Sequence, residues 1–163
     1  LRKMKKEWFQ PVSEEDMQNH MTAALATLRC NRLMEEQKYA QAKEEMNAIA
    51  NSENALSGLN KNFLTNDMIF CELLESYEPA VIEQLLTKPQ KQFMKSMKHY
   101  PSILRTQYAL ALIYEKNAKK ADKIKLQFNK IVSTYPYPVE IEAEEKNMEL
   151  AANIAKKLTN TED

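Results

Sequence analysis

Residues 32–42 read RLMEEQKYAQA and join two stretches of sequence that have the periodicity of α-helices. Before this joint, apolar residues recur every three or four positions: Met17, Met21, Ala24, Leu25 and Leu28. After the joint the same spacing returns: Tyr39, Ala42, Met46 and Ile49. The pattern predicts an antiparallel hairpin of two amphipathic helices, the first over 14–36 and capped by Ser13, each burying its apolar stripe against the next helix.

Prolines divide the rest of the chain into further helical segments. Residues 51–60 are rich in Asn and Ser, contain the only glycine and predict a loop. Residues 59–100 read as three short helices, and further helices are expected from Pro101, around 121–131 and from Pro138. No segment alternates with a period of two, so no sheet is expected. The sequence predicts an all-α fold of seven or eight helices in antiparallel hairpins.

The same pattern assigns the domain organisation. We expect a single helical-repeat domain over 13–158, a basic lead-in over 1–12 and a disordered tail over 159–163. A chain of 163 residues buries enough surface to fold without a disulfide or a metal. Cys30 and Cys71 have no metal-ligand pattern near them and are expected to be buried free thiols.

The composition argues against several classes of function. The 23 Lys+Arg balance the 23 Asp+Glu, whereas a dedicated nucleic-acid binder needs excess positive charge. A single glycine excludes a phosphate-cradling loop. His20 and His99 have no partner histidine at metal-ligand spacing, and adjacent acids on a helix diverge by about 100° instead of converging on a pocket. We therefore expect no enzymatic activity, no metal and no cofactor.

Two internal sequence similarities indicate a repeat. Residues 93–101 align with residues 128–136 and share Phe, Lys, Tyr and Pro in register. In a second internal similarity, a small residue follows three positions after the joint of two paired helices, where it would let the helices pack closely. The pairs are Tyr39 with Ala42, Tyr77 with Ala80, and Ala118 with Ala121. The chain thus resembles the tetratricopeptide-repeat family, in which units of about 34 residues pair two helices. This resemblance implies a stacked helical array that binds its partner along a concave face.

Positive charge is concentrated in the middle of the chain. Residues 88–130 carry a net charge of +9, against −5 before them and −4 after them. Seven lysines of this part are spaced to share helical faces: Lys91, Lys95, Lys98, Lys116, Lys120, Lys123 and Lys130. In a repeat array they would form one basic ridge that attracts an acidic peptide, an anionic membrane surface or nucleic acid. The alternative is an ordinary solvated face.

The first residues have the composition of a segment beside a membrane. Four cations precede an aromatic pair, and the side chains that carry this pattern are Arg2, Lys3, Lys5, Lys6 and Trp8. Flanking cations favour the cytoplasmic side, and Trp favours the headgroup level. The alternative is a solvated terminus. Because the chain begins at Leu1, we expect a piece of a longer protein held at the cytoplasmic, inner face of a membrane.

The predicted function is non-catalytic binding of a protein or peptide by a scaffold or regulatory domain. Residues 1–6, 29–32 and 135–138 also give the chain a fainter resemblance to the soluble helical tails of bacterial site-two-class zinc metalloproteases. That resemblance implies the alternative of a regulatory tail whose active site lies outside this chain, since no HExxH motif is present. A third alternative, a nucleic-acid binder, would depend on Lys91, Lys95 and Lys120.

Overall fold

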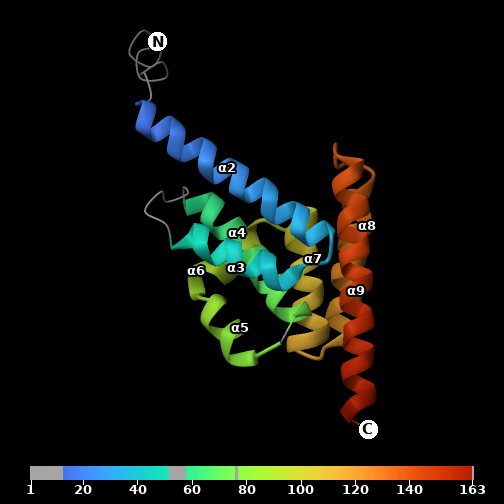
Figure 1. Cartoon of the computed structure of the whole chain (residues 1–163). Coiled ribbons are helices and arrows are strands. Elements are labelled where there is room, and N and C mark those ends of the chain that lie inside the picture. The colour runs from blue at the N-terminus through green and yellow to red at the C-terminus, as the bar shows by residue number, and fades with distance from the viewer. Residues whose placement is uncertain (1–12, 52–57, 76, 163) are drawn as a thin grey trace.

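The computed structural model describes residues 13–51, 58–75 and 77–162 (Figure 1). These residues form eight α-helices and one π-helical segment and contain no strand, which confirms the predicted all-α class. The segments are α2 Glu14–Glu35, α3 Tyr39–Ala50, α4 Gly58–Leu74, α5 Pro79–Leu85, α6 Lys88–Ser96, α7 Pro101–Ala109, η1 Leu110–Tyr114, α8 Ala118–Val132 and α9 Pro138–Glu162. The predicted disordered tail is wrong over 159–162, because α9 continues without a break to Glu162.

Several helices begin where local signals predict, whereas α4 begins at Gly58, inside the loop predicted over 51–60. The Ser13 hydroxyl accepts a hydrogen bond from the backbone N–H of Asp16 at 3.1 Å and caps α2. Thr87 caps α6 in the same way, and Asn117 caps α8. Proline occupies the first turn of α5, α6 and α7, where the missing N–H has no partner to lose.

Two helix ends take the left-handed backbone conformation without glycine. Gln37, after α2, has a φ of 61°, and Lys116, after η1, has a φ of 52°. The N–H of Lys38 donates to the carbonyl of Leu33 at 2.8 Å, which closes the turn after α2. A left-handed non-glycine residue costs about 1–2 kcal/mol, so the closing bonds and the packing of the hairpin must offset that cost.

Helix α3 returns alongside α2 in the opposite direction, and α4 follows on the inner side of α3 (Figure 1). Helices α4 and α7 lie at the centre: α4 contacts α3, α5, α6 and α7, while α7 also contacts α8 and α9. Helix α9 reaches back to α4, so the last helix closes on the first half of the chain.

Two hydrophobic clusters hold these helices together. The larger one is built from α2 to α7 and η1, with Ala151 of α9, and its fully buried side chains include Met46 and Phe70. The smaller one joins α7, α8 and α9 through Leu104, Phe128 and Met148. Packing between helices far apart in sequence therefore contributes most of the fold's stability.

The predicted burial of the first helix is wrong. The side of α2 that is covered carries Cys30 and Met34, which are 2% and 6% exposed. The predicted stripe lies on the opposite side of the helix and is 52–65% exposed at its large residues: Met17, Met21, Leu25 and Leu28. The physical reason is visible in Figure 1, where the N-terminal half of α2 projects beyond α3 and α4. Only the C-terminal half has neighbours, and they cover the Cys30 side.

Candidate functional site

The outer face of α2, defined by Met17, Met21, Leu25 and Leu28, is the most prominent apolar surface among the described residues. The other large exposed apolar side chains are scattered over α8, α9 and the turn between them: Leu126, Val132, Tyr137, Val139 and Leu158. Single exposed apolar residues are normal in a folded protein, whereas a contiguous stripe marks an interaction site. The outer face of α2 is therefore the first candidate site.

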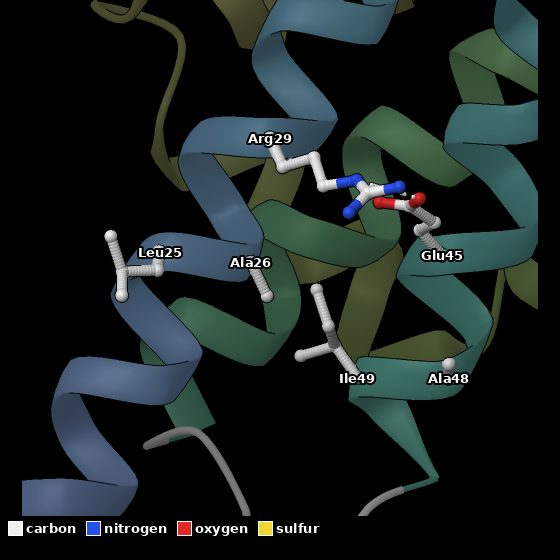
Figure 2. Close-up of a pocket in the computed structure, with 6 residues that line it drawn as sticks. All are labelled: Leu25, Ala26, Arg29, Glu45, Ala48 and Ile49. Atoms are coloured by element: carbon white, nitrogen blue, oxygen red, sulfur yellow. Dashed lines mark ion pairs between the residues drawn. The ribbon is translucent and has the colours of Figure 1, made fainter.

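A pocket of about 410 Å³ adjoins this face between α2 and α3. Its lining residues are Leu25, Ala26, Arg29, Glu45, Ala48 and Ile49. Figure 2 shows Arg29 reaching from α2 toward Glu45 on α3, while Ala26 and Ile49 face each other below them. Arg29 Nε lies 2.9 Å from Glu45 Oε1. The site offers an apolar floor and one neutralised ion pair, which suits an apolar side chain.

A smaller cavity of about 280 Å³ lies between α3, α4 and α5. Its lining residues are Lys43, Asn47, Met68, Glu72, Glu78, Val81 and Leu85. Lys43 forms an ion pair with the buried Glu72, so the two charges compensate each other. This lining contains neither a hydroxyl or thiol nucleophile nor a histidine, and we assign the cavity no chemistry.

The most highly charged cluster lies in the core and centres on Arg105 of α7. Its guanidinium Nη2 is 2.9 Å from Asp67 Oδ1 of α4 and 2.9 Å from Glu144 Oε2 of α9. Its Nη1 donates to Thr106 Oγ1 at 2.9 Å, and its Cζ lies 4.4 Å from the ring centre of Phe70. One buried cation thus joins three helices.

The protonation states of this cluster follow from its surroundings. Burial lowers the pKa of Arg105, but the carboxylates of Glu144 and Asp67 outweigh burial and raise the pKa above its usual range. Burial raises the pKa of Asp67, and the nearby Glu144 adds to the rise, while Arg105 opposes it. All three guanidinium nitrogens of the buried Arg105 donate hydrogen bonds to neighbouring side chains, so we interpret the cluster as structural.

The sequence reasoning missed this cluster. Arg105 is the only charged residue in 101–114, a segment that is otherwise mostly apolar. A lone arginine in such a segment is rarely left unpaired, and this signal could have marked it as a buried ion pair. Its partners, 38 and 39 residues away, could not have been chosen among the many acids of the chain.

The structure does not bring the seven predicted lysines together. Lys91 and Lys95 lie on α6, with Lys98 just after it, and all are exposed. The other four lie on α8 or in the turn before it: Lys116, Lys120, Lys123 and Lys130. Helix α6 packs on α4 whereas α8 packs on α7, and the two lie on opposite sides of the molecule (Figure 1). The expected joint ridge is therefore divided into two separate groups, and Lys120 pairs with Glu115 at 2.8 Å.

The predicted repeat positions pack only in part. Tyr39 and Ala42 are buried in the larger cluster, and Ala121 is buried in the smaller one. Ala80 and Ala118 are exposed at the starts of α5 and α8, so they do not mediate close helix packing as expected. Tyr77 is partly buried against the larger cluster.

Both cysteines are free and buried, as predicted. Burial raises the pKa of Cys30 to about 11 and that of Cys71 to about 12, so both thiols stay protonated at neutral pH. His99 is exposed and lies against the ring of Tyr100. The side chain of His20 lies outside the described residues. So does the whole basic lead-in with Arg2, Lys3, Lys5, Lys6 and Trp8.

Two other kinds of site, a metal centre and a membrane span, are absent from the described residues. No group of three or more His, Cys, Asp or Glu side chains there is arranged to hold a metal ion. None of the helices in the same part of the chain combines the length and the apolar character needed to cross a membrane. Comparison of the chain with known protein families, curated proteins and solved structures finds no match. A proposal of function therefore depends on the surfaces described above.

Proposed function

We propose that this chain is a non-catalytic protein-interaction domain that binds its partner through the outer face of α2 and the pocket beside it. The observation that carries the proposal is the exposure of four large apolar side chains on one stripe of a single helix. Exposed stripes of this kind are typical of helices that pack on another protein. The pocket extends the apolar surface around Leu25, which belongs to both.

The side chains of this surface suit adaptable binding. Met17 and Met21 supply flexible thioether side chains that adjust to the shape of a partner. Arg29 and Glu45 form a polar rim at one end of the pocket. An apolar centre with a polar rim is the usual anatomy of a protein interface.

The experiment is site-specific photo-crosslinking in cells that express the chain. A photo-reactive benzoylphenylalanine at position 21 should give a discrete adduct, because this position is at the centre of the proposed interface. The matched control carries the same group at position 126, where Leu126 is 62% exposed on α8. Adducts that are absent at position 21, or equal at both positions, would overturn the proposal.

For the cellular setting, we propose the cytoplasmic face of a membrane. The support is the sequence alone: four cations followed by an aromatic pair, carried by Arg2, Lys3, Lys5, Lys6 and Trp8. Cosedimentation with vesicles containing anionic lipid should fall when the four cations are changed to Gln. Equal sedimentation of both proteins, or none of either, would remove this setting without affecting the interaction through α2.

A further inference from the structure

The four apolar residues of the outer face of α2 are placed almost evenly on the two sides of position 23. They are separated by four, four and three residues, so the stripe is nearly symmetric about position 23. A surface that is complementary to itself is the requirement for a twofold symmetric dimer. We propose that the partner bound by this face is a second copy of the chain, with the two α2 helices antiparallel about position 23. This inference rests on the proposed function, whose partner it names.

The antiparallel arrangement pairs every apolar member of the face. With position 23 at the axis, Met21 lies opposite Leu25 of the second copy, and Met17 lies within one residue, about 1.5 Å along the helix axis, of the level of Leu28. Each pair occurs twice because of the symmetry. The side chains recur at helical spacing along one side of α2, as in the seam of two packed helices.

Charged residues at the two ends of α2 select the direction. The first turn is acidic, with Glu14, Glu15 and Asp16, and the last turn carries Arg32. At 100° per residue, Glu14 and Arg32 each lie within about 20° of Met21 around the helix axis, so both belong to the same side as the outer face. Both are exposed. The antiparallel pairing sets Glu14 opposite Arg32 of the second copy at both ends, whereas a parallel pairing would set like charges opposite each other.

The surroundings of α2 leave room for the second helix. The projecting N-terminal half of α2 has no neighbour on its outer side among the described elements (Figure 1), and the pocket against α3 begins only at Leu25. Met21 of the second copy would lie beside Leu25, at the edge of the pocket of about 410 Å³. A flexible methionine suits entry into this pocket.

The first experiment measures the mass of the purified chain by sedimentation velocity over a concentration series. We expect a reversible equilibrium between monomer and dimer. The double variant Met21→Lys with Leu25→Lys should raise the dissociation constant more than about 100-fold, because it places two charges per chain at the centre of the interface. The control Leu126→Lys removes an equally exposed leucine from α8 and should leave the constant unchanged. Circular dichroism should show that both variants keep the helical content of the parent chain.

The second experiment tests the direction by disulfide crosslinking. A mixture of the Met17→Cys and Leu28→Cys chains should form a disulfide-linked pair, while either chain alone should form few. Cys30 and Cys71 are buried and do not compete. In addition, Glu14→Arg and Arg32→Glu should each weaken the dimer, and the two changes in one chain should restore it.

Several outcomes would overturn the inference: a monomer at every concentration, a dimer that the lysine variant does not weaken, or self-crosslinking of each cysteine chain alone. A monomer that still photo-crosslinks a different protein at position 21 would refute self-association and leave the interaction function in place. A monomer without any adduct at position 21 would refute both.

Discussion

Helix α2 carries apolar side chains on two opposite sides, and the two sides have different fates. Cys30 and Met34 on the inner side are buried against the rest of the fold, whereas Met21 and Leu25 on the outer side are exposed. The residue types on the two sides are similar, so composition does not separate them. The difference shows that apolar periodicity identifies a surface to be covered without saying what covers it. On the inner side, α3 and the core cover it, and on the outer side we propose that another chain does.

The largest expected effect on the free energy of unfolding comes from the buried ion pairs of Arg105. Arg105→Met should lower the free energy of unfolding by about 3–5 kcal/mol, because it leaves the carboxylates of Asp67 and Glu144 close together without their cation. Urea unfolding at pH 7 measures the loss. The loss should become smaller at lower pH: the pKa of Asp67 is already raised in the fold, and a protonated carboxyl carries no uncompensated charge. A loss below about 1 kcal/mol would contradict the structural role of this cluster.

The next effect compares the two sides of α2 directly with one substitution. Met34→Ala removes a buried side chain and should cost about 2–5 kcal/mol. Met21→Ala makes the same change on the outer side and should cost less than about 0.5 kcal/mol in dilute protein, where self-association makes no contribution. Thermal or urea unfolding of the two variants provides the test. Equal losses would show that the outer face is covered within the single chain.

A third comparison measures the reactivity of two thiols on α2, one introduced at position 28 and the other that of Cys30. At pH 8, an exposed thiol with a pKa of about 8.5 is about one quarter ionised, whereas the Cys30 thiol, with a pKa of about 11, is about 0.1% ionised. A cysteine introduced by Leu28→Cys should therefore react with iodoacetamide at least about 200-fold faster than Cys30. Mass spectrometry of the labelled peptides measures both rates in one sample. Similar rates in the folded chain would contradict the burial of Cys30, and similar rates in urea are the expected control.

The smallest effect is expected at the ion pair beside the pocket. Arg29 is mostly exposed and Glu45 partly so, and exposed ion pairs contribute about 0–1 kcal/mol. Arg29→Gln should therefore change the free energy of unfolding by less than about 1 kcal/mol, and less still in high salt. A loss above about 2 kcal/mol would show that the rim of the pocket is part of the core, in contrast to its proposed role in binding.

Much of the secondary structure follows from local signals. Ser13 and the prolines at the starts of α5, α6 and α7 act through their own backbone geometry, so their effects can be predicted without a fold. The same reasoning fails at the end of α9. Polar residues 159–162 lack a strong stop signal, and the helix continues through them.

The candidate site followed only in part from the sequence. The stripe from Met17 to Leu28 is recognisable by its spacing, but the spacing alone does not show whether another helix covers it, and in the structure it is exposed. The lysines of α6 and α8 share helical faces in sequence, but α4 and α7 hold those helices apart. Spacing along one helix is a local property, whereas the distance between two helices depends on every contact that separates them.

By itself, the sequence determined that this chain is all-helical and where most of its helices begin, because caps, prolines and apolar period act over a few neighbouring residues. Only the tertiary structure decided that Arg105 meets Asp67 and Glu144, and that the outer face of α2 stays exposed. These outcomes depend on packing between segments about 40 residues apart. Both sides of α2 satisfy the same helical period, so only the position of α3 could choose between them.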